Sequence, residues 1–116
     1  MHESLNLVVL RGVLSSEPVV RHLASGSVLV SLEVTTTTDE GNWSVPVAWF
    51  DPRSVPEWPA GREVVVTGVV RRRFFRSGGL TQSRTEVVAS EVSLASSARR
   101  VERLISTALL RMGGDR

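Results

Sequence analysis

The chain has 116 residues, enough for one domain with a single hydrophobic core. Its 41% hydrophobic and 22% charged residues are ordinary for a globular protein, and the absence of cysteine excludes disulfides, thiolate catalysis and cysteine zinc sites. The chain has only two histidines, His2 and His22, which argues against a histidine-rich metal site. We therefore expect neither a metal nor a cofactor.

The formal net charge of +2 hides an asymmetry along the chain. Residues 1–70 carry four arginines and eight acids, a net −4, whereas residues 71–116 carry ten arginines and four acids, a net +6. A polyanionic partner would therefore meet mainly the second half of the chain. The N-terminus lacks a charged segment followed by an apolar run, and no segment reaches about 18 uninterrupted apolar residues. We expect no signal peptide, no membrane partner and a cytoplasmic, nucleoid-associated protein.

The first elements in chain order are predicted to be strands. Residues 5–14, LNLVVLRGVL, are apolar on both faces, and Gly12 marks a bend of the kind found at barrel corners. A turn at residues 15–18 leads to a short strand at residues 19–23. Residues 28–38, VLVSLEVTTTT, alternate between apolar and polar side chains, which predicts a half-buried strand.

Another long strand is expected at residues 43–50, WSVPVAWF. Pro46 cannot donate a ladder hydrogen bond, so it should lie at a bulge or at a free edge. Trp49 alternates with Val45 and Val47 and is expected in the core. Residues 51–60, DPRSVPEWPA, contain three prolines and predict an irregular loop with at most one helical turn, in which Trp58 closes the bottom of the fold.

Residues 62–94 predict two long strands joined by a turn at Gly78 and Gly79, where two glycines permit the positive φ that a hairpin needs. We name residues 71–84 the arm. The arm holds no acid and five arginines, a charge of +5, beside two aromatic rings: Arg71, Arg72, Arg73, Arg76, Arg84, Phe74 and Phe75. A basic arm with flat rings suits a flexible polyanion with exposed bases. The alternative is a solvated hairpin whose arginines keep it soluble.

The C-terminal segment predicts a helix that begins after Ser96 or Ser97 and ends at Gly113 and Gly114. Its apolar stripe should pack on the barrel or on a neighbouring subunit, and it consists of Ala98, Val101, Leu104, Ile105, Ala108, Leu109 and Met112. Together these elements predict an all-β fold, the five-stranded oligonucleotide-binding (OB) barrel, with an extended basic hairpin between its last two strands. The barrel domain would span residues 1–95, followed by the helix and a short tail at residues 96–116.

Residues 6–94 resemble the bacterial single-stranded DNA-binding proteins of the replication type. NLVVLRGVLSSEPVVR, residues 6–21, is similar to the start of that family, and TEVV, residues 85–88, is similar to the segment before its final strand. The resemblance implies binding of single-stranded DNA without strong sequence preference, protecting it during replication, recombination or repair. It also implies a homotetramer, or as second choice a dimer, that forms through pairing of first strands.

The resemblance also implies which rings stack on DNA bases. One is Phe50, and its partner earlier on the same strand would be Trp43, one residue further away than in the family. A bulge at Pro46 would absorb the extra residue. The ring on the hairpin is Phe75 when counted from Gly68, or Phe74 when counted back from Glu86.

Strand alternation and the resemblance indicate the remaining DNA contacts. Alternation along the strand puts Phe75 on the same face as Arg71 and Arg73, which favours it over Phe74. Arg21 could contact phosphate or pair with Glu17, and the resemblance favours DNA. The arm arginines would contact phosphates in the same way.

Three expectations concern what the protein does not do. The family's acidic, aromatic-ended tip has no counterpart in residues 112–116, so we expect no partner recruitment through a tail. The sequence contains no catalytic grouping, P-loop or dinucleotide fingerprint, so we expect no catalytic residues and no enzyme. The alternative function is an OB-fold protein-interaction module, or a primosomal-type relative, with weak or no DNA binding.

Overall fold

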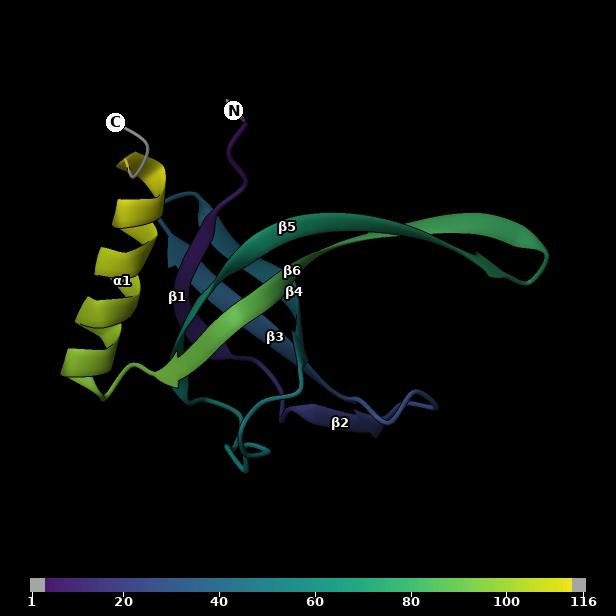
Figure 1. Cartoon of the computed structure of the whole chain (residues 1–116), viewed down its shortest axis with the longest axis horizontal. Coiled ribbons are helices and arrows are strands. Elements are labelled where there is room, and N and C mark those ends of the chain that lie inside the picture. The colour runs from purple at the N-terminus through teal and green to yellow at the C-terminus, as the bar shows by residue number, and fades with distance from the viewer. Residues whose placement is uncertain (1–3, 114–116) are drawn as a thin grey trace.

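The computed structural model describes residues 4–113 and is a closed five-stranded barrel with one extra strand and one C-terminal helix (Figure 1). The all-β, OB-like barrel expected from the sequence is therefore confirmed. The elements in chain order are β1 Val8–Leu14, β2 Val19–His22, β3 Val28–Thr38, β4 Gly41–Phe50, β5 Glu63–Ser77, β6 Leu80–Leu94 and α1 Ala98–Gly113. Among residues 4–113, no helix is long and apolar enough to cross a membrane.

The barrel closes where β1 pairs with two strands at once. The hydrogen-bonded order is β1-β5-β6-β4-β3-β2, and an additional pairing of Val13 with Thr35 and of Leu14 with Val34 joins β1 to β3. Within residues 4–113, β2 pairs only with β3 and lies outside the closed ring. A Cβ atom at Gly12 would lie 2.5 Å from the Thr35 carbonyl oxygen, so the closure needs glycine at the predicted bend.

The core is built mainly from valines on alternate positions of the strands. The buried residues of this core cluster are Leu14, Val30, Leu32, Val34, Val47, Val64, Val66 and Val87. Trp49 and Trp58 pack against the cluster and stack on each other, with ring centroids 6.1 Å apart and an interplanar angle of 17°. This confirms the predicted core position of Trp49 and the role of Trp58, which comes from the proline-rich loop after β4.

Helix α1 lies against the outside of the barrel (Figure 1). Val101 and Leu104 form a second buried cluster with Val65 of β5. The Val101 amide donates to the Ser97 carbonyl at 3.0 Å, so the helix begins after Ser97, as predicted. Gly114 and the side chain of Ala98 lie outside what the structure describes.

The predicted stripe of α1 is only partly buried. Val101, Leu104 and Ala108 contact the barrel, whereas Ile105, Leu109 and Met112 are exposed. The period of apolar residues along a helix identifies its apolar side but not the width of the surface that covers it. Part of the stripe therefore packs on the barrel, and packing of the rest on a neighbouring subunit stays a prediction.

Smaller corrections concern the strand ends. β1 begins at Val8 instead of Leu5, β2 ends at His22 instead of Leu23, and β4 begins at Gly41. No helical turn forms in the loop at residues 51–60. Val70 has the same alternation along β5 as the buried Val64 and Val66 but is 45% exposed, because β5 leaves the barrel here and continues into the arm.

Candidate nucleic-acid interface

The arm is a long two-stranded hairpin that projects from the barrel (Figure 1). Its strands pair without interruption from Arg71 opposite Glu86 to Ser77 opposite Leu80. Gly78 and Gly79 form the turn with φ angles of 60° and 80°, the left-handed conformation that a two-residue hairpin turn needs. The predicted hairpin and its glycine turn are confirmed.

A bulge in β6 lies where the arm joins the barrel. Thr67 pairs with Glu91 and Gly68 pairs with Ala89, so Ser90 is one residue too many on β6. The Ser90 hydroxyl donates to the Thr67 carbonyl at 3.0 Å. A Cβ atom at Gly68 would lie only 2.1 Å from the Val88 carbonyl oxygen, so this junction requires glycine.

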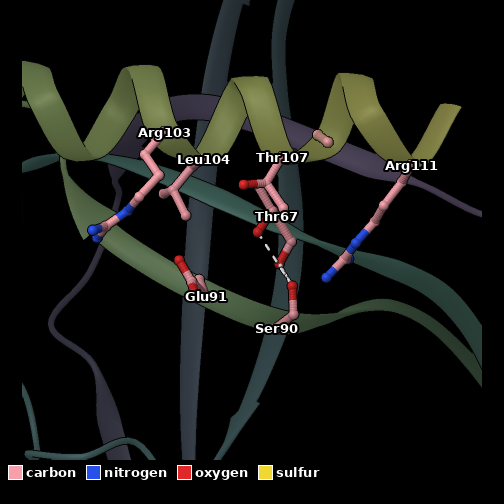
Figure 2. A pocket seen from close by; sticks show the side chains of 8 residues that line it. Thr67, Ser90, Glu91, Arg103, Leu104, Thr107 and Arg111 are labelled. Atoms are coloured by element: carbon pink, nitrogen blue, oxygen red, sulfur yellow. Dashed lines mark hydrogen bonds between the residues drawn. The ribbon is translucent and has the colours of Figure 1, made fainter. Parts of the chain in front are cut away.

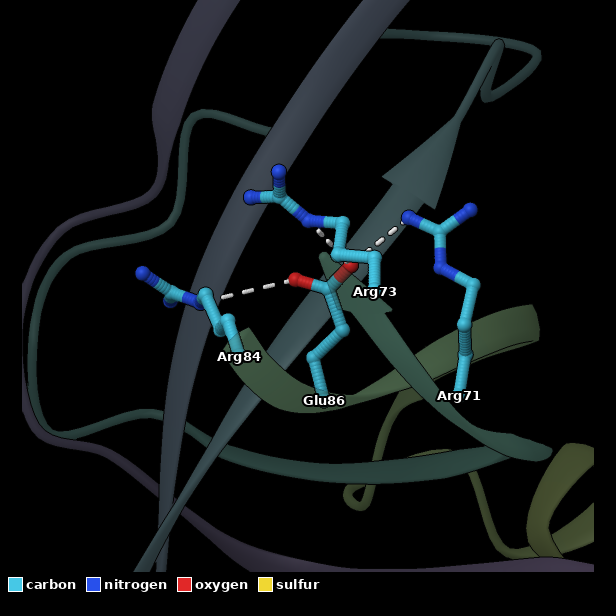
Figure 3. A network of polar contacts seen from close by, with 4 residues as sticks. All are labelled: Arg71, Arg73, Arg84 and Glu86. Atoms are coloured by element: carbon cyan, nitrogen blue, oxygen red, sulfur yellow. Dashed lines mark hydrogen bonds and ion pairs between the residues drawn. The ribbon is translucent and has the colours of Figure 1, made fainter. Parts of the chain in front are cut away.

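Three arm arginines share one buried carboxylate, that of Glu86, which is 6% exposed (Figure 3). Arg71 donates to Glu86 Oε2 at 2.6 Å, and Arg73 Nε donates to the same oxygen at 3.2 Å. Arg84 Nε lies 3.5 Å from Glu86 Oε1. We name these four residues the Glu86 cluster. Its net charge is +2, because Glu86, just beyond the arm, neutralises part of the +5 that residues 71–84 carry.

Three consecutive arginines of the arm, Arg71, Arg72 and Arg73, each place their guanidinium group over an aromatic ring. The Arg71 Cζ atom is 5.7 Å from the centre of the Phe50 ring, and Arg73 Cζ is 5.2 Å from the centre of Phe75. Arg72 Cζ is 5.2 Å from the centre of Phe74. These separations are within the range of a cation–π interaction. The arm therefore carries paired rings and guanidinium groups, not separate ones.

Most of the predicted contact residues share the outer face, by which we mean the side of the sheet that points away from the core cluster. On β5 and β6, alternation and register put Arg71, Arg73, Arg84 and Phe75 on this face. On the barrel, Arg21 pairs with Leu29 and Leu29 pairs with Phe50, so these three side chains form one row across β2, β3 and β4. The cation–π contact of Arg71 with Phe50 joins the arm to that row.

The other predicted residues lie on the opposite face of their strands. Arg72, Phe74 and Arg76 alternate with the outer residues of the arm. Phe74 is 66% exposed, and Arg72 donates to Ser83 Oγ at 3.1 Å. Arg76 donates to the Gly79 carbonyl at 2.8 Å, and this hydrogen bond stabilises the turn.

Trp43 does not share the face of Phe50. β4 pairs with β3 in one continuous register from Gly41 to Phe50, so the bulge expected at Pro46 is absent and that prediction is wrong. β6 pairs with β4 only at Val47 and Ala48, so Pro46 lies beyond that ladder, as the free-edge alternative required. Trp43 is 55% exposed, and its indole N–H donates to Thr38 Oγ1 at 3.1 Å. The DNA contact that the resemblance implies for Trp43 therefore lies outside the face that carries Phe50.

Glu86 and Ser83 were not named as site residues from the sequence, although a signal for them exists. In a two-residue hairpin turn, pairing can be counted outward from the two turn residues. Counting from Gly78 and Gly79 puts Glu86 opposite Arg71 and Ser83 opposite Phe74, as observed. The register of the arm was therefore encoded in the position of its glycines.

Two cavities lie along α1. One of about 270 Å³ lies between α1 and β6 (Figure 2). Arg111 extends beside the hydrogen-bonded hydroxyls of Thr67 and Ser90, and Arg103 lies at the other end, on the side of Glu91. The other, of about 770 Å³, lies beside the loop at residues 51–60. Its lining contains three arginines and three acids: Arg53, Arg100, Arg103, Asp51, Glu57 and Glu91. This balance makes it a weaker candidate for a polyanion than the outer face.

Within residues 4–113, no group of three or more histidine or acidic side chains is placed to hold a metal ion. No model of a known protein family matches the chain, and no curated protein matches it. The geometry of the outer face and the sequence pattern are therefore the features that indicate a function.

Proposed function

We propose that the protein binds single-stranded DNA without strong sequence preference and keeps it unpaired and protected during replication, recombination or repair, in the cytoplasm at the nucleoid. The proposal is supported above all by one observation: Phe50 and Phe75 lie on the same outer face, each beside an arginine, and Arg21 lies in the same row as Phe50. The resemblance of residues 6–94 to the bacterial single-stranded DNA-binding proteins points the same way. No catalytic step is part of this proposal.

The chemistry of the outer face favours a single strand over a duplex. Guanidinium groups attract phosphates of either form, but aromatic side chains can stack only on bases that are not already paired and stacked in a duplex. Each stacked base contributes about 1–3 kcal/mol, and every base offers a flat face, so such binding tolerates many sequences. Arg21 and Phe50 are two strand spacings apart, roughly 10 Å, so one bound strand could contact both side chains.

Titration of a labelled oligothymidine with the full chain, followed by fluorescence anisotropy, tests the proposal. The association constant should fall steeply with salt, by a log–log slope of about 0.7 for each phosphate neutralised, and a duplex of equal length should bind more weakly. Phe50→Leu should weaken binding about tenfold, because one stacked base is lost. No saturable binding at low salt, or equal affinity for the duplex, would contradict the proposal.

Trp43→Leu is the matched control, because Trp43 is also an exposed ring but lies on the opposite face of β4. We expect it to change the affinity by less than about threefold, well below the contribution of one stacked base. A loss equal to that of Phe50→Leu would show that the outer face is not the principal site.

We also propose that the protein is a homo-oligomer, a tetramer or alternatively a dimer, with β1 in the contact. Val9 and Val13 of β1 are exposed on the side of the strand that points away from the core, which leaves apolar surface for a second copy. Light scattering of the full chain measures the mass directly. A monomer at concentrations that saturate DNA would refute this part of the proposal.

One observation favours a second candidate function, that of a protein-interaction module. Ile105, Leu109 and Met112 form an exposed apolar side of α1, the kind of surface on which another protein can dock. The oligothymidine titration separates the two candidates. Absence of binding even at low salt favours the interaction module.

A further inference from the structure

We infer that Arg71 and Arg73 contact bases instead of phosphates. Their guanidinium groups, held over Phe50 and Phe75 by the shared carboxylate of Glu86, form composite platforms on which nucleobases stack. This inference rests on the proposed binding of single-stranded DNA. It assigns to these two arginines a different role from that of the other cations of the arm.

Each of the two guanidinium groups is fixed by two contacts. Arg71 lies over Phe50 and donates to Glu86 Oε2, and Arg73 lies over Phe75 and donates to the same oxygen. Hydrogen bonds of a guanidinium group lie in its plane and leave its two flat faces open. Figure 3 shows Arg71 and Arg73 reaching Glu86 from two sides. One carboxylate oxygen therefore orients two flat cations beside two rings.

A base approaching from solvent would meet rings that are only partly exposed and guanidinium groups beside them. Phe50 is only 37% exposed and Phe75 is half-buried, so each ring offers part of its surface. The side chains of Arg71 and Arg73 remain 41% and 45% exposed. Guanidinium planes are known surfaces for stacking unpaired bases. The flat surface that a base reaches at these two positions therefore includes the guanidinium group as well as the ring.

The positive charge is not distributed evenly among the arm arginines. Glu86 neutralises part of the positive charge at Arg71 and Arg73, the two arginines that make its shortest contacts. Arg84 makes the longest contact of the cluster, at 3.5 Å, and Arg76 bonds only a neutral carbonyl of the turn. Neither of these two guanidinium groups lies within cation–π distance of a described ring. Arg76 and Arg84 are therefore the better phosphate contacts.

The test is a pair of double substitutions that preserve charge. Lysine keeps the positive charge of arginine but has no plane to stack. Arg71→Lys with Arg73→Lys should weaken oligothymidine binding about tenfold to a hundredfold, because two platforms each lose part of a stacking interaction. The slope of log K against log salt should stay as in the wild type, because the number of cations is unchanged.

Arg76→Lys with Arg84→Lys is the comparison, with the same number of changes on the same arm. It should weaken binding clearly less than the first pair does, because a phosphate still accepts hydrogen bonds from a lysine, whereas a stacking plane is lost at Arg71 and Arg73. Thermal unfolding of each variant shows whether the fold is kept. The single change Arg73→Lys, further out on the exposed arm, replaces the double variant if that one unfolds.

The outcomes separate this inference from the proposed function. If the variant with Arg71→Lys and Arg73→Lys binds oligothymidine as tightly as the wild type, the inference is overturned. The proposed function would still stand. An equal loss in the Arg76→Lys and Arg84→Lys variant would also overturn it, because all four arginines would then act alike. A wild-type protein that binds no oligothymidine at low salt would refute both.

Discussion

Replacing Glu86 with glutamine keeps the shape of the side chain and removes the charge that three arginines share. The substitution removes the negative charge that accepts hydrogen bonds from Arg71 at 2.6 Å and from Arg73 at 3.2 Å. It also removes the ion pair with Arg84 at 3.5 Å. Such hydrogen bonds contribute about 1.5–3 kcal/mol each when buried. The arginines are 41–48% exposed and can be hydrated instead, which reduces the loss. We therefore expect Glu86→Gln to lower the free energy of unfolding by about 2 kcal/mol.

The same substitution should change DNA binding in a characteristic way. The net charge of the Glu86 cluster rises from +2 to +3, so the log–log salt slope should steepen by up to about 0.7. At low salt the variant should bind both single strands and duplex more tightly than the wild type. At high salt it should bind single strands more weakly, because Arg71 and Arg73 are no longer held over their rings. The salt curves of the two proteins should cross.

Thermal unfolding and anisotropy titrations over a range of salt concentrations measure both effects. A loss of about 2 kcal/mol corresponds to a fall of the melting temperature by about 8 °C for a chain of this size. The control is Glu57→Gln in the exposed loop after β4, which should stay within about 0.5 kcal/mol of the wild type. An unchanged melting temperature would show that the cluster does not form, and parallel salt curves would show that Glu86 does not control the charge of the face.

Two further substitutions test the junction and the core. Gly68→Ala would place a Cβ atom 2.1 Å from the Val88 carbonyl oxygen and should destabilise the fold by about 3 kcal/mol. Gly26→Ala is the control: Gly26 has a φ of +94°, but a Cβ atom there would meet no atom within 4 Å, so this change should cost only about 1 kcal/mol. If urea unfolding gives the same loss of stability for both variants, the steric clash at Gly68 is not the cause. Trp58→Ala should cost about 3 kcal/mol because it removes the ring that stacks on Trp49, and a midpoint of urea unfolding equal to that of the wild type would show that the loop does not close the barrel.

Strict patterns in the sequence predicted the elements that depend on local rules. Strict alternation located β3 at residues 28–38, and the glycine pair located the turn of the arm. Alternation also put Arg71, Arg73 and Phe75 on one face, as the register confirms. Each of these inferences uses only the two-residue period of a strand or the positive φ of a glycine.

Predictions failed where the answer depended on what lies beside an element. Val70 alternates with Val64 and Val66 of the core, yet it is 45% exposed because β5 leaves the barrel there. Pro46 was compatible with a bulge or an edge, and only the register with β3 excludes the bulge. Tertiary contacts decide such cases, and a pattern along one segment does not contain them.

The Glu86 cluster was missed because β5 and β6 pair in one register in the arm and in another, shifted by one residue, in the barrel. Counting outward from Gly78 and Gly79 puts Glu86 opposite Arg71, but the barrel pairs Val66 with Val92, one residue out of step with that count. The extra residue, Ser90, reconciles them. A one-residue shift exchanges the two faces of a strand. Without the bulge, the register of the barrel would turn Val87 outward, away from the core cluster, and would put Glu86 opposite Arg72, on the other face of the arm. The bulge at Ser90 is therefore what allows one β6 strand both to fill the core and to hold Arg71 and Arg73 beside their rings.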